Sequence, residues 1–203
     1  MITKENVLGN RIIWIDIAKG IGILAMILGH SFYGSLTPII YSFHMPLFFI
    51  LAGYTIKEFK GNVFSVEFKD FKRLIVPCFV VRAIILFGNC MINHENLTVE
   101  IETFFLSLLW GNHYGSFFGI GLPAIGRIWF LPALFLSKLI YRIMLGKFDE
   151  KSRFPLLLIL SFVCMFLGSH NVILPQNIDM IFVCVLFMDI GHKLKEIDLS
   201  KLK

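Results

Sequence analysis

IIWIDIAKGIGILAMILGHSFY, residues 12–33, decides the fold class of this chain. A run of about 20 mainly apolar residues is the length that an α-helix needs to cross about 30 Å of hydrocarbon. Similar blocks recur along the chain, and hydrophobic residues make up 57% of it, whereas soluble domains average about 45–50% even with glycine counted. The sequence therefore predicts an all-α, multi-pass transmembrane helical bundle.

Six spans are predicted in all. They cover residues 12–33, 38–56, 71–92, 128–145, 154–169 and 178–194. A further segment, residues 97–111, has an apolar helical face with Glu100 and Glu102 near its start. That pattern is typical of a helix lying at the membrane surface, and we expect one there.

Basic residues alternate between the connecting segments. Lys and Arg gather in the leader, in residues 57–73 and 142–153, and in the tail from residue 193, whereas the loops at 34–37, 93–127 and 170–177 carry almost none. Positively charged loops stay in the cytoplasm. We therefore predict that both termini are cytoplasmic and that the lipid bilayer is the main partner of the chain.

The net charge of +5 follows from this topology, because the basic residues form no single patch, and no nucleic-acid partner is expected. The four cysteines lie in or beside apolar segments without a CxxC spacing. They are interpreted as small packing residues, so neither a metal site nor a disulfide framework is predicted.

A polar stripe runs along the first span. Its members are spaced three, four, three and four residues apart, which keeps them on one helical face: Asp16, Lys19, Ile23, Met26 and His30. Lys19 and His30 are three turns apart, or about 16 Å along the axis. The opposite face carries Ile17, Ile21, Leu24 and Leu28 and is expected to meet lipid.

A charge at the centre of a spanning helix costs about 2.5–3.5 kcal/mol on insertion scales, so such residues usually face a polar cavity or a partner. We interpret the whole stripe as functional. Two simpler interpretations stay open: Asp16 and Lys19 form an ion pair near the cytoplasmic boundary, and His30 is an interface residue near the outer end.

The second span places His44 two residues before Pro46 and ends near Gly53. Proline removes one helical hydrogen bond and bends the helix, and glycine permits close approach of a neighbouring helix. We expect the bend to turn His44 toward the site that His30 faces. The alternative is a kinked helix with a hydrogen-bonded structural histidine.

Five segments together resemble the membrane acyltransferase-3 family, the bacterial integral-membrane enzymes that O-acetylate sugars and cell-surface polysaccharides. They are RIIWIDIAKGIGILAMILGH (11–30), IIYSFHMPLFFILAGY (39–54), FKDFKRLIVP (68–77), IWFLPALF (128–135) and ILPQNIDMIFVCVLFMDIGHKLKE (173–196). The resemblance covers nearly the whole chain, with the segments in the family's order.

Three motifs of that family fall on particular residues. The basic-residue-x10-His motif lands on Lys19 and His30, with Lys where Arg is common. The Phe-Phe-x-x-Ser-Gly motif lands on residues 48–53, with alanine replacing serine. The Arg-x-x-Arg motif lands on residues 70–73, where only Arg73 matches and Asp70 departs.

The resemblance implies transfer of an acetyl or other acyl group from acyl-CoA to a hydroxyl of a glycan or cell-surface polysaccharide. It implies acetyl-CoA as donor substrate, no bound cofactor or metal, and a multi-pass location in the bacterial inner (plasma) membrane. His30 is the candidate general base, with an acyl-histidine intermediate as the alternative. His44 and Asp16 are candidate catalytic partners, and Lys19 and Arg73 are candidate ligands of the CoA phosphates.

Family members have more membrane helices than the six predicted here, so we expect residues 1–203 to be the N-terminal portion of a single domain of this kind. Its activity would then depend on a C-terminal half. Two other function classes stay open: a transporter-like protein whose His/Asp/Lys stripe conducts protons, and a non-catalytic membrane fragment that packs with a partner.

Overall fold

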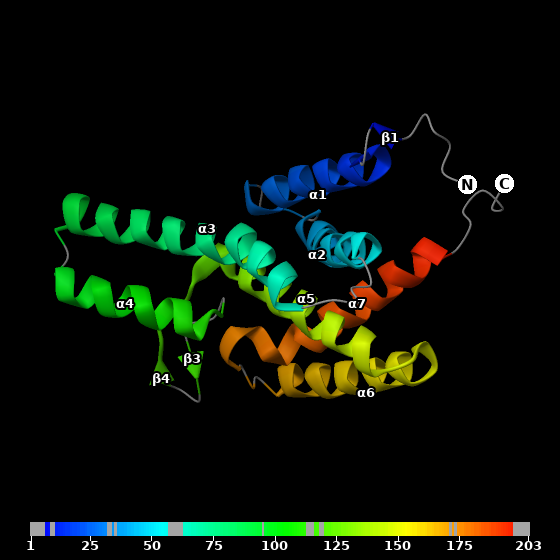
Figure 1. Cartoon of the computed structure of the whole chain (residues 1–203). Coiled ribbons are helices and arrows are strands. Elements are labelled where there is room, and N and C mark those ends of the chain that lie inside the picture. Colours follow the sequence, from blue (N-terminus) through cyan, green and yellow to red (C-terminus); the bar gives the residue numbers. More distant parts are fainter. Residues whose placement is uncertain are drawn as a thin grey trace. The chain divides into compact units, whose positions relative to one another are not determined.

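The computed structural model describes residues 7–8, 11–31, 34, 36–56, 63–94, 96–112, 116–117, 120–170, 172 and 174–196. Its α-helices are α1 (Ile13–Ser31), α2 (Thr37–Thr55), α3 (Val63–Ile92), α4 (Leu97–Trp110), α5 (Phe130–Lys147), α6 (Glu150–Ser169) and α7 (Ile178–Glu196) (Figure 1). Two 3-10 turns, η2 (Gly126–Trp129) and η3 (Pro175–Asn177), precede α5 and α7. The predicted all-α class is confirmed.

Two very short antiparallel strand pairs accompany the helices. β1 (Val7–Leu8) pairs with β2 (Arg11–Ile12), and β3 (Ser116–Phe117) pairs with β4 (Ile120–Gly121). The described residues fall into two compact units, one formed by residues 1–57 with 187–203 and the other by residues 58–186. Helix α7 contributes its first half to the second unit and its second half to the first.

In the first unit, α1 and α2 pack as an antiparallel pair. At one end, Ile15 of α1 joins Leu51 and Tyr54 of α2 in a buried apolar cluster. Farther along, small residues of α1 form the contact: a Cβ added at Gly22 would lie 3.1 Å from the Phe48 ring. Small residues let helix backbones approach closely where the surrounding lipid gives no hydrophobic driving force.

Helix α2 also crosses the second half of α7 at very short range. A Cβ at Gly53 would collide with the backbone carbonyl of Met188, and one at Gly191 would collide with the carbonyl of Ile50. The predicted role of Gly53, close approach of a neighbouring helix, is confirmed, and the neighbour is α7.

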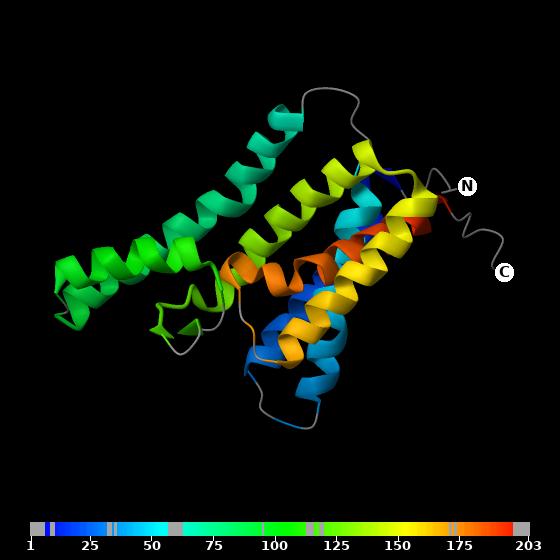
Figure 2. The same cartoon turned by 90° about the horizontal axis from the view of Figure 1, so that it is seen from below.

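In the second unit, α3 and α4 lie side by side as an antiparallel hairpin (Figures 1 and 2). The C-terminal end of α4 is fixed to the turn before α7, because the Asn177 side chain donates to the Gly111 carbonyl (2.9 Å) and Asn112 donates to the Leu174 carbonyl (2.9 Å). Helices α6 and α7 are joined by Ser161, whose hydroxyl donates to the Phe182 carbonyl at 3.0 Å.

Two polar side chains of α4 are buried in the α3–α4 hairpin, while some of its large apolar side chains are exposed. Glu100 and Ser107 of α4 are buried, and Glu100 accepts a hydrogen bond from the Asn89 amide of α3 at 3.1 Å. Phe105 and Leu109 are 56% and 72% exposed. The helix predicted for residues 97–111 is present, with Glu100 facing α3 and Glu102 exposed. Its location at the membrane surface stays a prediction.

Each predicted span overlaps one α-helix of the described residues, although the spans at 12–33, 38–56 and 128–145 extend a few residues beyond it. Among the residues that the structure describes, four helices are long and apolar enough to cross a membrane: Ile13–Ser31, Thr37–Thr55, Phe68–Ile92 and Glu150–Ser169. Helices α5 and α7 carry more charge, with Lys138, Arg142 and Lys147 on α5 and Asp189 among the charges of α7. The count of six spans stays a prediction.

Candidate active site

His30 and His44 approach the same residue, Tyr41, in the first unit. The Tyr41 hydroxyl lies 2.8 Å from His30 Nδ1 and 3.2 Å from the Gly29 carbonyl oxygen, to which it can donate. The ring centroids of Tyr41 and His30 are 5.4 Å apart, and those of Tyr41 and His44 are 5.3 Å apart. Both predicted histidines therefore contact the same tyrosine ring.

The hydrogen bonds restrict where the ring protons sit. His44 is 1% exposed, and its Nδ1 lies 2.7 Å from the Ile40 carbonyl. A carbonyl only accepts, so Nδ1 carries the proton and the neutral His44 ring has its lone pair on Nε2. When Tyr41 donates its single proton to Gly29, His30 must donate Nδ1–H to the Tyr41 oxygen, and the basic nitrogen of His30 is then also Nε2.

The sequence positions Tyr41 by close helix packing. A Cβ added at Gly29 would lie 3.0 Å from Cγ2 of Ile40, which is tighter than an ordinary van der Waals contact. The absence of a side chain at Gly29 lets the first turns of α2 approach the last turn of α1. That approach brings the Tyr41 hydroxyl within hydrogen-bond distance of α1.

Asp16 and Lys19 lie on the same helix, toward its other end. Asp16 is exposed and Lys19 is half-buried, and within the described residues the structure records no ion pair between them. The opposite face of α1 is open as predicted: its apolar residues, Ile17, Ile21, Leu24 and Leu28, are 47–62% exposed. His30 thus contacts α2, whereas Asp16 lies outside that contact.

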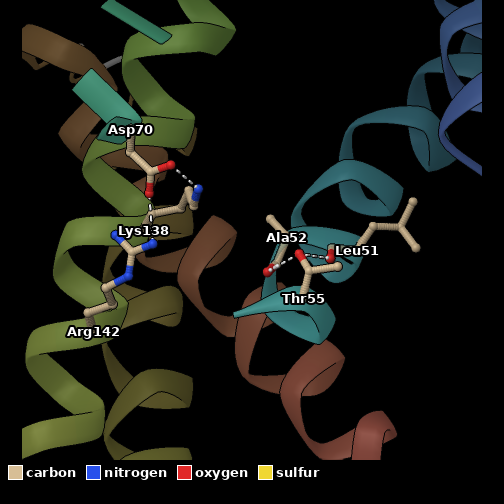
Figure 3. Close-up of polar contacts among 6 residues, drawn as sticks. All are labelled: Leu51, Ala52, Thr55, Asp70, Lys138 and Arg142. Atoms are coloured by element: carbon tan, nitrogen blue, oxygen red, sulfur yellow. Dashed lines mark hydrogen bonds and ion pairs between the residues drawn. The ribbon is translucent and has the colours of Figure 1, made fainter. Parts of the chain in front are cut away.

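Arg73 belongs to the second unit, where it is exposed on α3. Asp70, three residues earlier, is buried and bonds two cations of α5: its carboxylate lies 2.8 Å from Lys138 Nζ and 2.7 Å from Arg142 Nη2 (Figure 3). Asp70, which departs from the family's Arg-x-x-Arg pattern, therefore has a structural role in joining α3 to α5. An acidic residue faces two basic side chains on the neighbouring helix.

Helix α7 adds polar residues that the sequence interpretation missed. Asp189 and His192 are 0% and 5% exposed, in the half of α7 that packs in the first unit. Lys193 lies 3.7 Å from the Asp189 carboxylate, one turn along the helix. The available signal was the Asp-x-x-His spacing in an apolar segment, which places both side chains on one helical face, together with the rule that a buried aspartate is almost always paired.

Tyr41 was also missed. An aromatic residue in an apolar helix usually indicates packing, and nothing in the order of residues shows that its hydroxyl meets the preceding helix. The i,i+3 spacing of Tyr41 and His44 was the available signal, since it places both rings on one face of α2. The roles suggested by the sequence for Asp16, Lys19 and Arg73 stay predictions.

The fold and this cluster define a helical membrane protein with ionisable side chains between two apolar helices. A family model described as an acyltransferase domain, Acyl_transf_3, matches residues 12–189. The chain therefore belongs to the membrane acyltransferase-3 family. Searches of curated proteins and of solved structures returned no significant match.

Proposed function

We propose that this chain carries the histidine site of an integral-membrane O-acyltransferase, which moves an acetyl or other acyl group from acyl-CoA to a hydroxyl of a glycan or cell-surface polysaccharide. The enzyme acts in the bacterial inner membrane. The observation that carries the proposal is the 2.8 Å contact between His30 Nδ1 and the Tyr41 hydroxyl, with the His44 ring 5.3 Å from the same tyrosine ring. Membership of the acyltransferase family supplies the reaction class.

In this mechanism, Nε2 of His30 takes the proton of the acceptor hydroxyl as the oxygen attacks the thioester carbonyl carbon. The new C–O bond forms, the carbonyl electrons move onto oxygen, and their return breaks the C–S bond. The CoA thiolate leaves and takes the proton back from His30. Tyr41 holds the Nδ1 side of the ring, so that the imidazolium formed in the first step keeps its orientation.

His44 has the second role. In the protonated form its Nε2–H can donate to the carbonyl oxygen, which becomes negative during attack, and such donors stabilise that charge. Lys19, which belongs to the same unit as His30, binds a CoA phosphate as a cation. Arg73 has the planar fork that suits two phosphate oxygens, but its part in phosphate binding stays a prediction from the sequence. The catalytic role of Asp16 also stays a prediction, because among the described residues Asp16 forms no ion pair with Lys19.

The test is acyl transfer by membranes that contain the His30→Ala variant of the active protein. General-base catalysis contributes about 10²- to 10⁴-fold, so we expect transfer to fall by at least about 100-fold while the amount of membrane-inserted protein is unchanged. His170→Ala is the matched control, because His170 is exposed at the end of α6 and bonds to its own helix. Its transfer rate should equal that of the natural chain.

Two results would contradict the proposal. If the His30→Ala variant retained acyl transfer, His30 would not be the general base. A proton flux through the natural chain that His30→Ala abolishes, with no acyl transfer by either, would instead favour a transporter in which His30, Tyr41 and His44 conduct protons.

A further inference from the structure

An apolar cavity lies within the second unit, among α3, α4 and α5. It encloses about 390 Å³, within the range of about 300–1,000 Å³ typical of small-molecule sites. Ile75, Cys78 and Phe79 of α3 line it together with Phe105 of α4 and Phe135 of α5. Gln176 also reaches the lining, but its Nε2 already donates to the Leu108 and Leu109 carbonyls, at 2.8 and 2.7 Å. The surface offered to a ligand is hydrocarbon.

Part of the cavity lining is exposed at the surface of the unit. Phe79 of α3 is 42% exposed, and Phe105 and Leu109 of α4, which also line it, are 56% and 72% exposed. Helix α3 is one of the candidate membrane spans, over Phe68–Ile92. The surroundings of a spanning helix are the acyl chains of the bilayer, so those chains are what meets the mouth of the cavity.

A cation lies beneath the cavity on the same helical face. Lys72 precedes Ile75 by three residues and Phe79 by seven, which aligns the three side chains along α3. The spacing puts Lys72 about 4.5 Å below Ile75 along the axis. Lys72 is exposed, with its Nζ 4.6 Å above the Phe68 ring.

Asp70, two residues before Lys72, is already paired with other cations. Asp70 is bonded to both Lys138 and Arg142, so this group of three carries a net charge of +1 (two cations and one carboxylate). Phe71 follows Asp70 on α3, and Phe135 lies one turn before Lys138 on α5. Their rings contact each other edge to face, with centroids 5.9 Å apart, and both line the cavity. Apolar space therefore adjoins positive charge along α3 and α5.

We propose that this cavity binds one acyl chain of an acidic bilayer phospholipid, whose phosphate contacts Lys72. A mainly apolar lining with exposed residues selects a hydrocarbon chain from the bilayer. The positive charge at one end selects a negatively charged headgroup over a zwitterionic one, because juxtamembrane cations attract anionic lipids. This site is independent of the histidine cluster and of the acyl transfer proposed for it.

The chain-binding part is tested by native mass spectrometry of the full chain in mild detergent, titrated with phosphatidylglycerol. Ile75→Trp fills the cavity, and we expect it to lower phosphatidylglycerol binding by more than about tenfold, since each methylene kept out of an apolar site is worth a factor of about four. Ile84→Trp is the matched control. Ile84 is 65% exposed on the same helix and outside the cavity lining, so binding should stay at the natural level.

The headgroup part is tested with phosphatidylcholine of identical acyl chains. The natural chain should prefer phosphatidylglycerol, and Lys72→Ala should reduce that preference by about fivefold, the effect of one juxtamembrane cation. Lys151→Ala, which removes an exposed cation at the start of α6, should leave the preference unchanged. Circular dichroism of each variant verifies that the helices are intact.

Three outcomes overturn the proposal. In the first, folded Ile75→Trp binds phosphatidylglycerol as well as Ile84→Trp does. In the second, the natural chain binds both lipids equally. In the third, a long-chain acyl-CoA displaces phosphatidylglycerol at a lower concentration than phosphatidylglycerol itself requires, which would identify the occupant as an acyl donor.

Discussion

Tyr41 links two helices through one hydroxyl group, which lies close to both the Gly29 carbonyl and His30 Nδ1. A hydroxyl offers one proton and two lone pairs, so it can donate to the carbonyl and accept from the histidine at the same time. Both partners are then satisfied in a region where unpaired polar groups are costly. The side chain that fixes the orientation of His30 is thus itself fixed by the backbone.

At the residue scale we therefore predict that Tyr41→Phe lowers kcat for acyl transfer by about tenfold, the effect of losing a hydrogen bond of about 1.5 kcal/mol to a ring that becomes charged. The KM for acyl-CoA should not change, because the ring and its contacts are kept. Tyr54→Phe is the control, since Tyr54 packs edge to face on Trp14 at the other end of α1 and α2. Equal kcat values for Tyr41→Phe and the natural chain would contradict the assignment.

At the element scale, the contact between α2 and α7 depends on two glycines. Each faces a backbone carbonyl of the other helix, Gly53 facing Met188 and Gly191 facing Ile50. A side chain can rotate away from an added methyl group, but a backbone in a helix cannot. The crossing is therefore sensitive to any substitution at either position, whatever its polarity.

We predict that Gly53→Ala lowers the free energy of unfolding by about 3 kcal/mol, the upper end of what overpacking usually costs. Thermal unfolding of the purified chain in detergent measures the change. Gly88→Ala on α3 is the control, because its new Cβ meets nothing within 4 Å, and alanine should stabilise that helix by up to about 1 kcal/mol. A Gly53→Ala variant that unfolds at the natural temperature would show that the helices do not cross this closely.

The contact between α3 and α5 depends instead on charge. We predict that Asp70→Asn lowers the free energy of unfolding by about 3 kcal/mol, because removal of one partner leaves buried charge uncompensated. Asp70→Arg should lower the free energy of unfolding further, since a third cation would then face Lys138 and Arg142. Glu102→Gln, which alters an exposed acid on α4, should have no effect in the same unfolding measurement. Natural stability in Asp70→Arg would contradict this interpretation.

At the scale of the whole molecule, hydropathy predicted where each helix lies, because a lipid-crossing segment must satisfy its own backbone and be apolar along its length. Periodicity predicted the exposed apolar face of α1, although Asp16 and Ile23 on the other face are exposed too. The lack of a side chain at Gly53 predicted its close packing. Neither specifies which helix covers a given face. Tyr41, the inward position of Glu100 and the α7 partner of Gly53 all depend on pairings between helices, so the structure was needed to find them.

The topology is the remaining whole-molecule prediction. Six spans place the α5–α6 turn in the cytoplasm, where its Lys147, Lys151 and Arg153 satisfy the positive-inside rule. If α5 does not cross, the same turn lies outside, on the side of residues 93–127. The charges on α5 make this a real alternative, because only α1, α2, α3 and α6 are both long and apolar enough among the described helices.

Labelling of a single cysteine introduced at position 151 distinguishes the topology in which α5 crosses the membrane from the one in which it does not. The four native cysteines, Cys78, Cys90, Cys164 and Cys184, are first replaced by serine, and Lys151→Cys or His170→Cys is then added. We expect a membrane-impermeant maleimide to label His170→Cys on intact cells, but to label Lys151→Cys only after permeabilisation, because α6 separates the two positions and positive charge stays inside. Labelling of Lys151→Cys on intact cells, with His170→Cys protected, would mean that α5 does not cross and would reverse the predicted orientation of α6.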